Sequence, residues 1–409
     1  MNHQPSSERG ALQAKERWST SARLVINIPD LSIYEDTLKV IGSLSRVLKR
    51  CYVLTVSGQA LYERYHNFWP NLYLIELPRL RFPRHAARWV DRAVKAGEIE
   101  IIHDLLGHLA PVCELLSQTS RPLIMIHTQR TTNWGWFERV MPLHFQIDLR
   151  YASQRARSLW FDRRILHAVD HITVMGPGHE KDLERGHGIS PERISFIPSE
   201  TDCHRFYPKE GWDEELDSIN SRSTLLYTGA LVRAKGLALL FDLFAHLGEL
   251  RADLTLVLIG RETPFERQWL VQCLENHPFR DRIECAGAIP RDQLLHRYQT
   301  ASLYLFPSHF EGSPRALREA IASGLPAIAS DIPGNRGIDP GHQFIRFAPV
   351  SDLSAWIDQS LEALREPPHS RLERIRAGVT HLREAHSPEA VATSWLNLYQ
   401  AVAEKKELF

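Results

Sequence analysis

Short apolar segments recur along the chain and alternate with longer segments of helical periodicity. Each apolar segment is at most eight residues long, rich in β-branched residues or Leu, and mostly lacks apolar–polar alternation. This pattern is typical of strands that are buried on both faces of a parallel sheet. It predicts strands at residues 23–28, 51–57, 71–77, 99–105, 121–128, 171–176, 194–199, 224–229, 253–260, 283–288, 303–308, 326–331 and 344–349.

The alternation predicts an α/β fold made of βαβ units, with two Rossmann-like, doubly wound parallel sheets that face a central cleft. The length of 409 residues suits two domains. Polar residues 206–222 lack a clear period and are interpreted as a linker, and residues 1–20 as a flexible tail. The predicted domains are therefore 21–205 and 223–386. Ligands of such sheets bind at the carboxyl ends of the strands, so functional residues should follow strands.

Composition narrows the class of protein. Lys and Arg together number 49, as do Asp and Glu, and this balance argues against a general nucleic-acid-binding protein. The five cysteines are scattered and form no CxxC pair, which favours free thiols in a reducing compartment. The polar N-terminus lacks the apolar core of a signal peptide, and no apolar stretch is long enough to span a membrane. We expect a cytoplasmic protein, with peripheral membrane contact as one option.

The segment HFEGSPRALREAIASGLPAIASD, residues 309–331, carries two carboxylates, Glu311 and Glu319. It follows a predicted strand, and Ser313 and Pro314 are suited to the N-cap and the first position of a helix. The N–H groups of Arg315 and Ala316 would then lie at a helix N-terminus, which attracts anions such as a nucleotide diphosphate. The alternative is a surface helix with two solvated glutamates.

A second segment, LLYTGALVRAKGLALLFDLF at 225–244, combines a strand, a glycine turn and a helix. Arg233 and Lys235 lie in the turn. Two cations after a strand suit a phosphate-bearing ligand, although a solvated loop is the alternative. The segment has neither the GxGxxG nor the Walker pattern.

Together these segments resemble the retaining GT-B glycosyltransferases of the "group 1" (family 4-like) type. Four motifs carry the resemblance in order: a GRLxxxKG-like loop at 229–236, a PSxxEG turn at 307–312, the paired glutamates, and an AxGxPVIAxD-like run at 322–331. The resemblance implies a retaining transferase that uses a nucleotide-diphosphate sugar, UDP- or GDP-linked, as co-substrate. It implies front-face attack, and since no DxD motif is present we expect no metal and no other cofactor.

The resemblance also implies the site. Glu319 would bind the ribose and Glu311 the donor sugar, while Arg233, Lys235 and the helix N-terminus would stabilise the leaving diphosphate. His127, after the strand at 121–128, would face the far hydroxyls of the sugar; the alternative is a strand-end histidine bonded to backbone. The predicted catalytic group is His127, Glu311, Lys235 and Arg233, and the predicted donor-binding residues are Gly229, Arg233, Lys235, Ile289, Glu311, Gly312, Ser313, Arg315, Ala316 and Glu319. Helix 387–409 resembles the last helix of the family, which crosses back to complete the first domain.

The chain departs from the family pattern in places. Ala230 replaces the arginine of the GRL loop, so Arg233 or Lys235 would have to bind the diphosphate, and the glycine loop expected after the first strand is absent. A catalytically weak GT-B scaffold protein and a non-hydrolysing nucleotide-sugar epimerase therefore stay open as alternatives. The acceptor is expected to be a glycan, a lipid-linked or a small molecule.

Residues 79–95 form a basic segment, with six Lys or Arg and a single acid, Asp91. Helical spacing places its apolar residues on one face and Arg84, Arg88, Arg92 and Lys95 on another. The segment is either a solvated helix packed on the first sheet or a peripheral contact with anionic membrane, to which a partly inserted Trp89 would add.

Overall fold

The computed structural model describes residues 22–28, 30–31, 34–57, 59–65, 67, 69, 71–105, 109–117, 123–130, 149–212 and 223–406. Thirteen strands occupy the thirteen predicted sites, each within a few residues of the expected bounds. They are β1 Arg23–Asn27, β2 Arg50–Thr55, β3 Leu72–Glu76, β4 Ile101–Asp104, β5 Ile124–Gln129, β6 His171–Val174, β7 Ile194–Phe196, β8 Thr224–Thr228, β9 Thr255–Ile259, β10 Ile283–Gly287, β11 Leu303–Phe306, β12 Ala327–Ser330 and β13 Ile345–Ala348. The predicted tail and residues 213–222 of the predicted linker lie outside the described residues.

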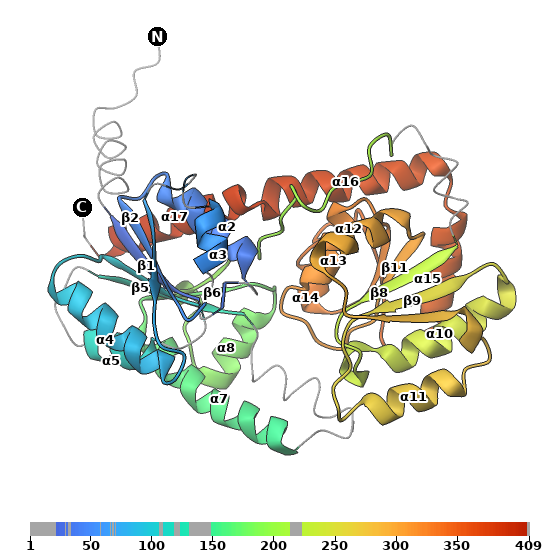
Figure 1. The fold of residues 1–409 in the computed structure, drawn as a ribbon, viewed down its shortest axis with the longest axis horizontal. Helices are drawn as coiled ribbons and strands as arrows, with labels where there is room; N and C mark the ends of the chain where they lie inside the picture. The colour runs from blue at the N-terminus through green and yellow to red at the C-terminus, as the bar shows by residue number, and fades with distance from the viewer. Residues whose placement is uncertain are drawn as a thin grey trace, which may run out of the picture.

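The strands form two sheets in which every paired strand is parallel. The first has the order β3-β2-β1-β4-β5-β6-β7 and the second β10-β9-β8-β11-β12-β13. Figure 1 shows the two sheets side by side, each with helices against it. In both sheets the first three strands of the domain add in one direction, and the fourth then lies on the other side of the first strand, which is the topology of a doubly wound sheet. The predicted fold class is thus confirmed.

Helices cover both faces of each sheet. Those in the first half are α2 Glu35–Ser45, α3 Gln59–Tyr65, α4 Phe82–Lys95, α5 Ala110–Leu116, α7 Leu149–Ala168 and α8 His179–His187. Those in the second are α10 Leu237–Leu250, α11 Arg267–Glu275, α12 Arg291–Thr300, α13 Arg315–Ala322, α14 Pro333–Arg336, α15 Leu353–Arg365 and α16 Pro368–His386. The last helix, α17 Pro388–Lys405, packs on the first sheet. Single 3₁₀ turns are η3 Pro191–Arg193 in the first half and η4 Arg233–Lys235 and η5 Arg280–Arg282 in the second.

The last two helices join the two halves of the molecule. α16 packs against α13 of the second half and continues into α17, which lies along α2 (Figure 1). Trp395 and Tyr399 of α17 are fully buried in the core that covers one face of the first sheet. The chain therefore ends on the sheet with which it began.

The opposite face of the first sheet is covered by α4, α5 and α7. Phe82, Ala86 and Val90 of α4 are buried there, as its helical spacing predicts. Trp89 is half-buried and packs with its ring centroid 5.4 Å from that of Tyr52, and its partial insertion into a membrane stays a prediction. No helix in the described part of the chain is both long and apolar enough to cross a membrane.

Candidate functional site

The turn after β11 leads into α13 and carries the first predicted carboxylate. The helix begins at Arg315 with Pro314 as its N-cap, so the prediction of Ser313 as N-cap is wrong. The Ser313 hydroxyl oxygen instead accepts a hydrogen bond from Nη1 of Arg318 at 2.5 Å. The first turn of α13 still holds the backbone N–H groups of Arg315 and Ala316, where the helix dipole favours an anion.

Glu311 and Lys235 come from separate predicted motifs and meet at this turn. Nζ of Lys235 donates to Oε1 of Glu311 at 2.6 Å. Gly236 follows η4 with φ +76°, and a Cβ there would lie 1.9 Å from the carbonyl oxygen of Pro307. Only glycine permits both this backbone conformation and this approach. The GRLxxxKG-like loop is therefore pressed against the PSxxEG turn.

Arg233 lies in the same turn as Lys235, but it forms an ion pair with a different carboxylate. Nε of Arg233 donates to Oε2 of Glu266 at 2.8 Å, and its guanidinium lies 5.4 Å from the ring centroid of Trp269. The structure does not bring Arg233 to the Lys235–Glu311 pair. Gly229 directly follows β8, and its amide donates to the carbonyl of Ile259 at the end of β9 at 2.9 Å.

Glu319 lies further along α13 and is buried. Its Oε1 accepts from Nη2 of Arg291 at 2.6 Å. Arg291 is the first residue of α12, which follows the short connection after β10, and it lies two residues beyond the half-buried Ile289. Burial raises the pKa of Glu319, and the neighbouring Arg291 opposes that rise. Sequence reasoning missed Arg291, although its place after a strand of the second sheet was a usable signal.

His127 ends up buried in β5 of the first sheet. Its Nε2 lies 2.7 Å from Oε1 of Gln129, whose Nε2 donates to Oδ2 of Asp162 at 3.4 Å. Because the Asp162 carboxylate only accepts, it turns the amide oxygen of Gln129 toward the imidazole, so a neutral His127 carries its proton on Nε2. Nδ1 is then an acceptor, and it is buried without a hydrogen-bond partner among the described residues.

The carboxyl-end loop of β6, the strand beside β5, meets the turn that holds Glu311. A Cβ on Gly176 would lie 2.1 Å from the carbonyl oxygen of Gly312, and a Cβ on Gly334 would lie 2.3 Å from that of Glu311. Glycine at these positions lets the loop of the first domain, the PSxxEG turn and α14 touch through their backbones. The carboxyl-end loop of β6 and the turn that holds Glu311 thus meet at the contact between the two domains.

Arg318 is a second residue that sequence reasoning missed. It is buried beside Glu319, and its guanidinium donates to Oγ1 of Thr201 at 2.8 Å and to the carbonyl of Glu200 at 3.2 Å. Burial lowers the pKa of Arg318 to about 10. This side chain ties the start of α13 to the segment that leaves the first domain.

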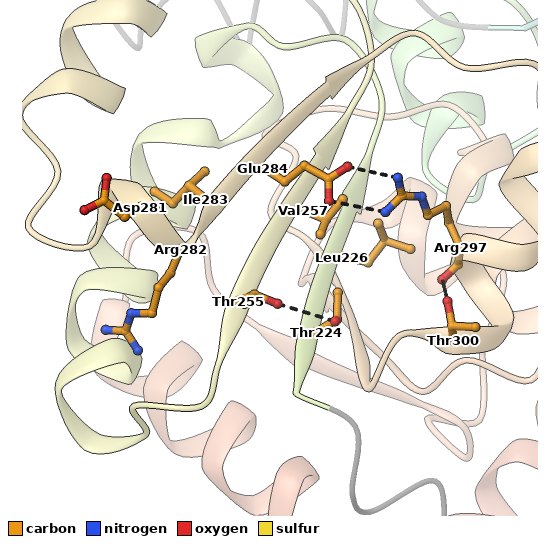
Figure 2. A pocket seen from close by; sticks show the side chains of 10 residues that line it. All are labelled: Thr224, Leu226, Thr255, Val257, Asp281, Arg282, Ile283, Glu284, Arg297 and Thr300. Atoms are coloured by element: carbon orange, nitrogen blue, oxygen red, sulfur yellow. Dashed lines mark hydrogen bonds and ion pairs between the residues drawn. The ribbon is translucent and has the colours of Figure 1, made fainter.

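A cavity of about 260 Å³ lies elsewhere in the second domain (Figure 2). Thr224, Thr255 and Ile283, the first residues of β8, β9 and β10, line it, together with the ion pair of Arg297 and Glu284. This is the amino edge of the sheet, opposite the edge that carries the predicted site, and none of the predicted residues lines it. The described residues hold no cluster of three or more His, Cys, Asp or Glu side chains placed for a metal ion.

The sequence of the second domain matches a known protein family. Residues 208–370 match the family model described as "Glycosyl transferases group 1". That segment contains Lys235, Glu311 and Glu319. Residues 208–370 belong to the group 1 glycosyl transferases.

Curated relatives of the chain have low identity. It is 27% identical over 239 residues to glycogen synthase of Mycobacterium tuberculosis, covering 57% of this chain and 51% of the relative. It is 25% identical over 235 residues to mannosylfructose-phosphate synthase of Agrobacterium fabrum, covering 53% and 51%. These matches thus span about half the length of the curated relatives.

Solved structures resemble the chain in fold over nearly its whole length. Sucrose-phosphate synthase from Thermosynechococcus elongatus has a TM-score of 0.72 at 19% identity and covers 94% of this chain and 100% of its own. Anabaena Alr3699/HepE, solved in complex with UDP, has a TM-score of 0.67 at 12% identity over 93% and 100%. The two facing parallel sheets are those of the GT-B fold.

Proposed function

We propose that the chain is a retaining glycosyltransferase that moves a sugar from a nucleotide-diphosphate sugar to a glycan, lipid-linked or small-molecule acceptor. The observation that carries the proposal is the convergence of Lys235 and Glu311 at the start of α13, with Glu319 further along the same helix. These groups lie at one edge of the second sheet and suit the parts of such a donor. The cation and the helix N-terminus suit its diphosphate, and the two carboxylates suit its ribose and its sugar. The UDP bound to Anabaena HepE supports UDP as the first nucleotide to test.

The donor would lie along α13. Its diphosphate would bind at the N–H groups of Arg315 and Ala316 and at Lys235, which stabilise the negative charge that develops as the glycosidic bond breaks. Both cations of the GRLxxxKG-like loop are ion-paired, but Lys235 is paired at the Glu311 turn that precedes α13, whereas Arg233 is paired with Glu266, so Lys235 serves this role. These groups supply the positive charge without a metal ion.

The two ends of the donor would be held by polar groups on either side of the diphosphate. Glu319 would accept hydrogen bonds from the ribose, and Glu311 would bind the sugar once Lys235 turns to the phosphates. Nδ1 of His127, an acceptor in the tautomer set by Gln129, would accept a hydrogen bond from a hydroxyl of the sugar. In the front-face reaction that the resemblance implies, an acceptor hydroxyl forms its bond to the sugar on the side where the bond to the diphosphate breaks, and an oxygen of the leaving diphosphate takes the hydroxyl proton.

Ligand binding and turnover without acceptor test the proposal. UDP, GDP, ADP and TDP are compared by thermal shift, where a ligand at about 100 times its Kd adds about 2.7 kcal/mol of stability. The corresponding nucleotide sugars are then incubated with the protein. Slow release of free nucleotide is expected, whereas an isomerised donor would indicate an epimerase and the absence of any binding a scaffold protein.

We further propose that α4 rests on an anionic membrane face, which would bring a lipid-linked acceptor near the cleft. Arg84, Arg88 and Arg92 are exposed, and Leu80 just before the helix is 80% exposed. Each basic residue near such a surface contributes about 1 kcal/mol. Leu80 is the more exposed apolar side chain and would insert beside the half-buried Trp89.

Liposome sedimentation at low and high salt tests this contact. The protein should sediment with anionic liposomes at low salt and not with neutral ones. Changing Arg84, Arg88 and Arg92 to Glu should abolish sedimentation, while Arg280→Glu, a change at an exposed arginine of the second domain, should not. A wild type that stays in the supernatant at low salt would argue for a soluble acceptor.

A further inference from the structure

The guanidinium of Arg291 lies between carboxylates of the two domains. Its Nη1 and Nη2 donate to Oδ1 and Oδ2 of Asp36 at 3.0 and 2.6 Å, and Nη2 also donates to Oε1 of Glu319 at 2.6 Å. Asp36 lies in the first turn of α2, whereas Arg291 and Glu319 belong to the second domain. The side chains of Asp36 and Glu319 are only 3% and 6% exposed.

The place of Arg291 is fixed from several sides. Pro290 caps α12, so Arg291 opens the helix at the carboxyl end of β10. Its guanidinium lies 5.4 Å from the ring centroid of Phe206, a fully buried residue of the segment that leaves the first domain. The two-bond contact with Asp36 fixes the plane of the guanidinium as well as its position.

A buried carboxylate such as Glu319 stays charged only when a cation compensates its lost hydration. Arg291 supplies that cation. An ionised carboxylate has about four acceptor positions, and the contact with Arg291 uses one of them on Oε1. The remaining positions suffice for the two hydroxyls of a ribose, whereas a protonated Glu319 would lose acceptor capacity.

We propose that Arg291 is the positioning residue that keeps Glu319 ionised and aimed at the donor ribose, with Asp36 as its anchor in the first domain. The inference rests on the proposed function, because it takes Glu319 as the group that binds the ribose. It adds that recognition of the ribose requires contact between the two domains, although Asp36 itself touches no ligand.

Calorimetric titration with UDP and with 2′,3′-dideoxy-UDP isolates the ribose hydroxyls. The wild type should bind UDP roughly tenfold or more tightly than the dideoxy analogue, because two hydrogen bonds to a charged group are lost. In Arg291→Ala the ratio of the Kd for the dideoxy analogue to the Kd for UDP should fall to about twofold or less, since the neutralised Glu319 no longer favours the hydroxyls. Arg291→Lys retains a cation and should keep part of the ratio.

A matched control lies on the same helix. Arg297 of α12 pairs with Glu284, and their side chains are 39% and 48% exposed. Arg297→Ala removes a guanidinium and an ion pair of the second domain alone, so its ratio should equal that of the wild type. In a Glu319→Gln background the ratio is already lost, and adding Arg291→Ala should not change it further.

The outcomes separate the two proposals. A wild type that binds neither UDP nor any other nucleoside diphosphate contradicts the proposed function itself. The inference is overturned if the wild type prefers UDP but Arg291→Ala raises the Kd for UDP and the Kd for the analogue by the same factor. Arg291 would then have only a structural role. Asp36→Asn should lower the ratio less than Arg291→Ala, and an unchanged ratio there refutes the role of Asp36 as anchor.

Discussion

Replacing Lys235 by Ala tests the cation that the proposed function requires. Its Nζ lies 2.6 Å from Glu311, and the two side chains are 29% and 11% exposed. The change removes a charged contact to the leaving diphosphate, and such contacts contribute about 1.5–3 kcal/mol. The Kd for UDP should therefore rise roughly tenfold to a hundredfold. The Kd for uridine, which lacks the phosphates, should stay nearly unchanged.

The same change has a second, separable effect on stability. Without Lys235 the mostly buried Glu311 loses its cation, which should lower the free energy of unfolding by about 1–3 kcal/mol. The double variant Lys235→Ala, Glu311→Gln removes the unpaired charge as well. It should regain most of the stability in urea denaturation but none of the affinity for UDP.

Calorimetry with UDP and uridine on the single and double variants measures both effects. Lys95→Ala, which removes an exposed lysine paired with Asp91 at 2.7 Å in α4, is the matched control and should leave both affinities unchanged. If Lys235→Ala weakens UDP and uridine by the same factor, Lys235 only holds the turn in shape. The assignment of the diphosphate to this cation would then be refuted.

Further expected outcomes concern the rest of the site and the cores. Glu319→Ala should raise the Kd for UDP, measured by calorimetry, roughly tenfold to a hundredfold, because a charged acceptor is lost. An unchanged Kd would show that Glu319 does not bind the ribose. His127→Ala and Glu311→Gln should lower turnover while leaving the Kd for UDP nearly intact, and the opposite pattern would reverse their roles. Gly236→Ala should lower the free energy of unfolding by roughly 1–3 kcal/mol, since φ is +76° and a backbone oxygen occupies the place of the new Cβ; an unaltered urea midpoint would contradict this. His103 is fully buried and burial lowers its pKa to about 3, so below about pH 6.5 the unfolded chain binds a proton that the folded chain does not. Stability should therefore fall as pH decreases from about 6.5, and His103→Gln should make that fall shallower in urea titrations at several pH values.

Local pattern was sufficient for the strands and for the paired glutamates. A strand buried on both faces of a parallel sheet must be apolar along its length, so a few consecutive residues are enough to locate it. The same holds for the turn at 307–312, because functional groups in such sheets follow the strands that present them. The sequence alone therefore located Glu311, Glu319 and Lys235, and the resemblance added the donor that they suit.

Local pattern was insufficient wherever the partner of a charge decided its role. Arg233 and Lys235 are two residues apart and looked equivalent, yet one pairs with Glu266 and the other with Glu311. The start of α13 at Arg315 is likewise set by contacts, since the hydroxyl of Ser313 is taken by Arg318.

The sequence by itself thus determined the two parallel-sheet domains and the stretch of chain that carries the candidate site. Only the tertiary structure decided which side chains complete that site. Asp36 and Arg291 are 255 positions apart and meet because the two domains face each other. Periodicity reports whether a residue is buried, but the partner of a buried charge depends on how separate sheets are brought together, and no short segment of sequence contains that information.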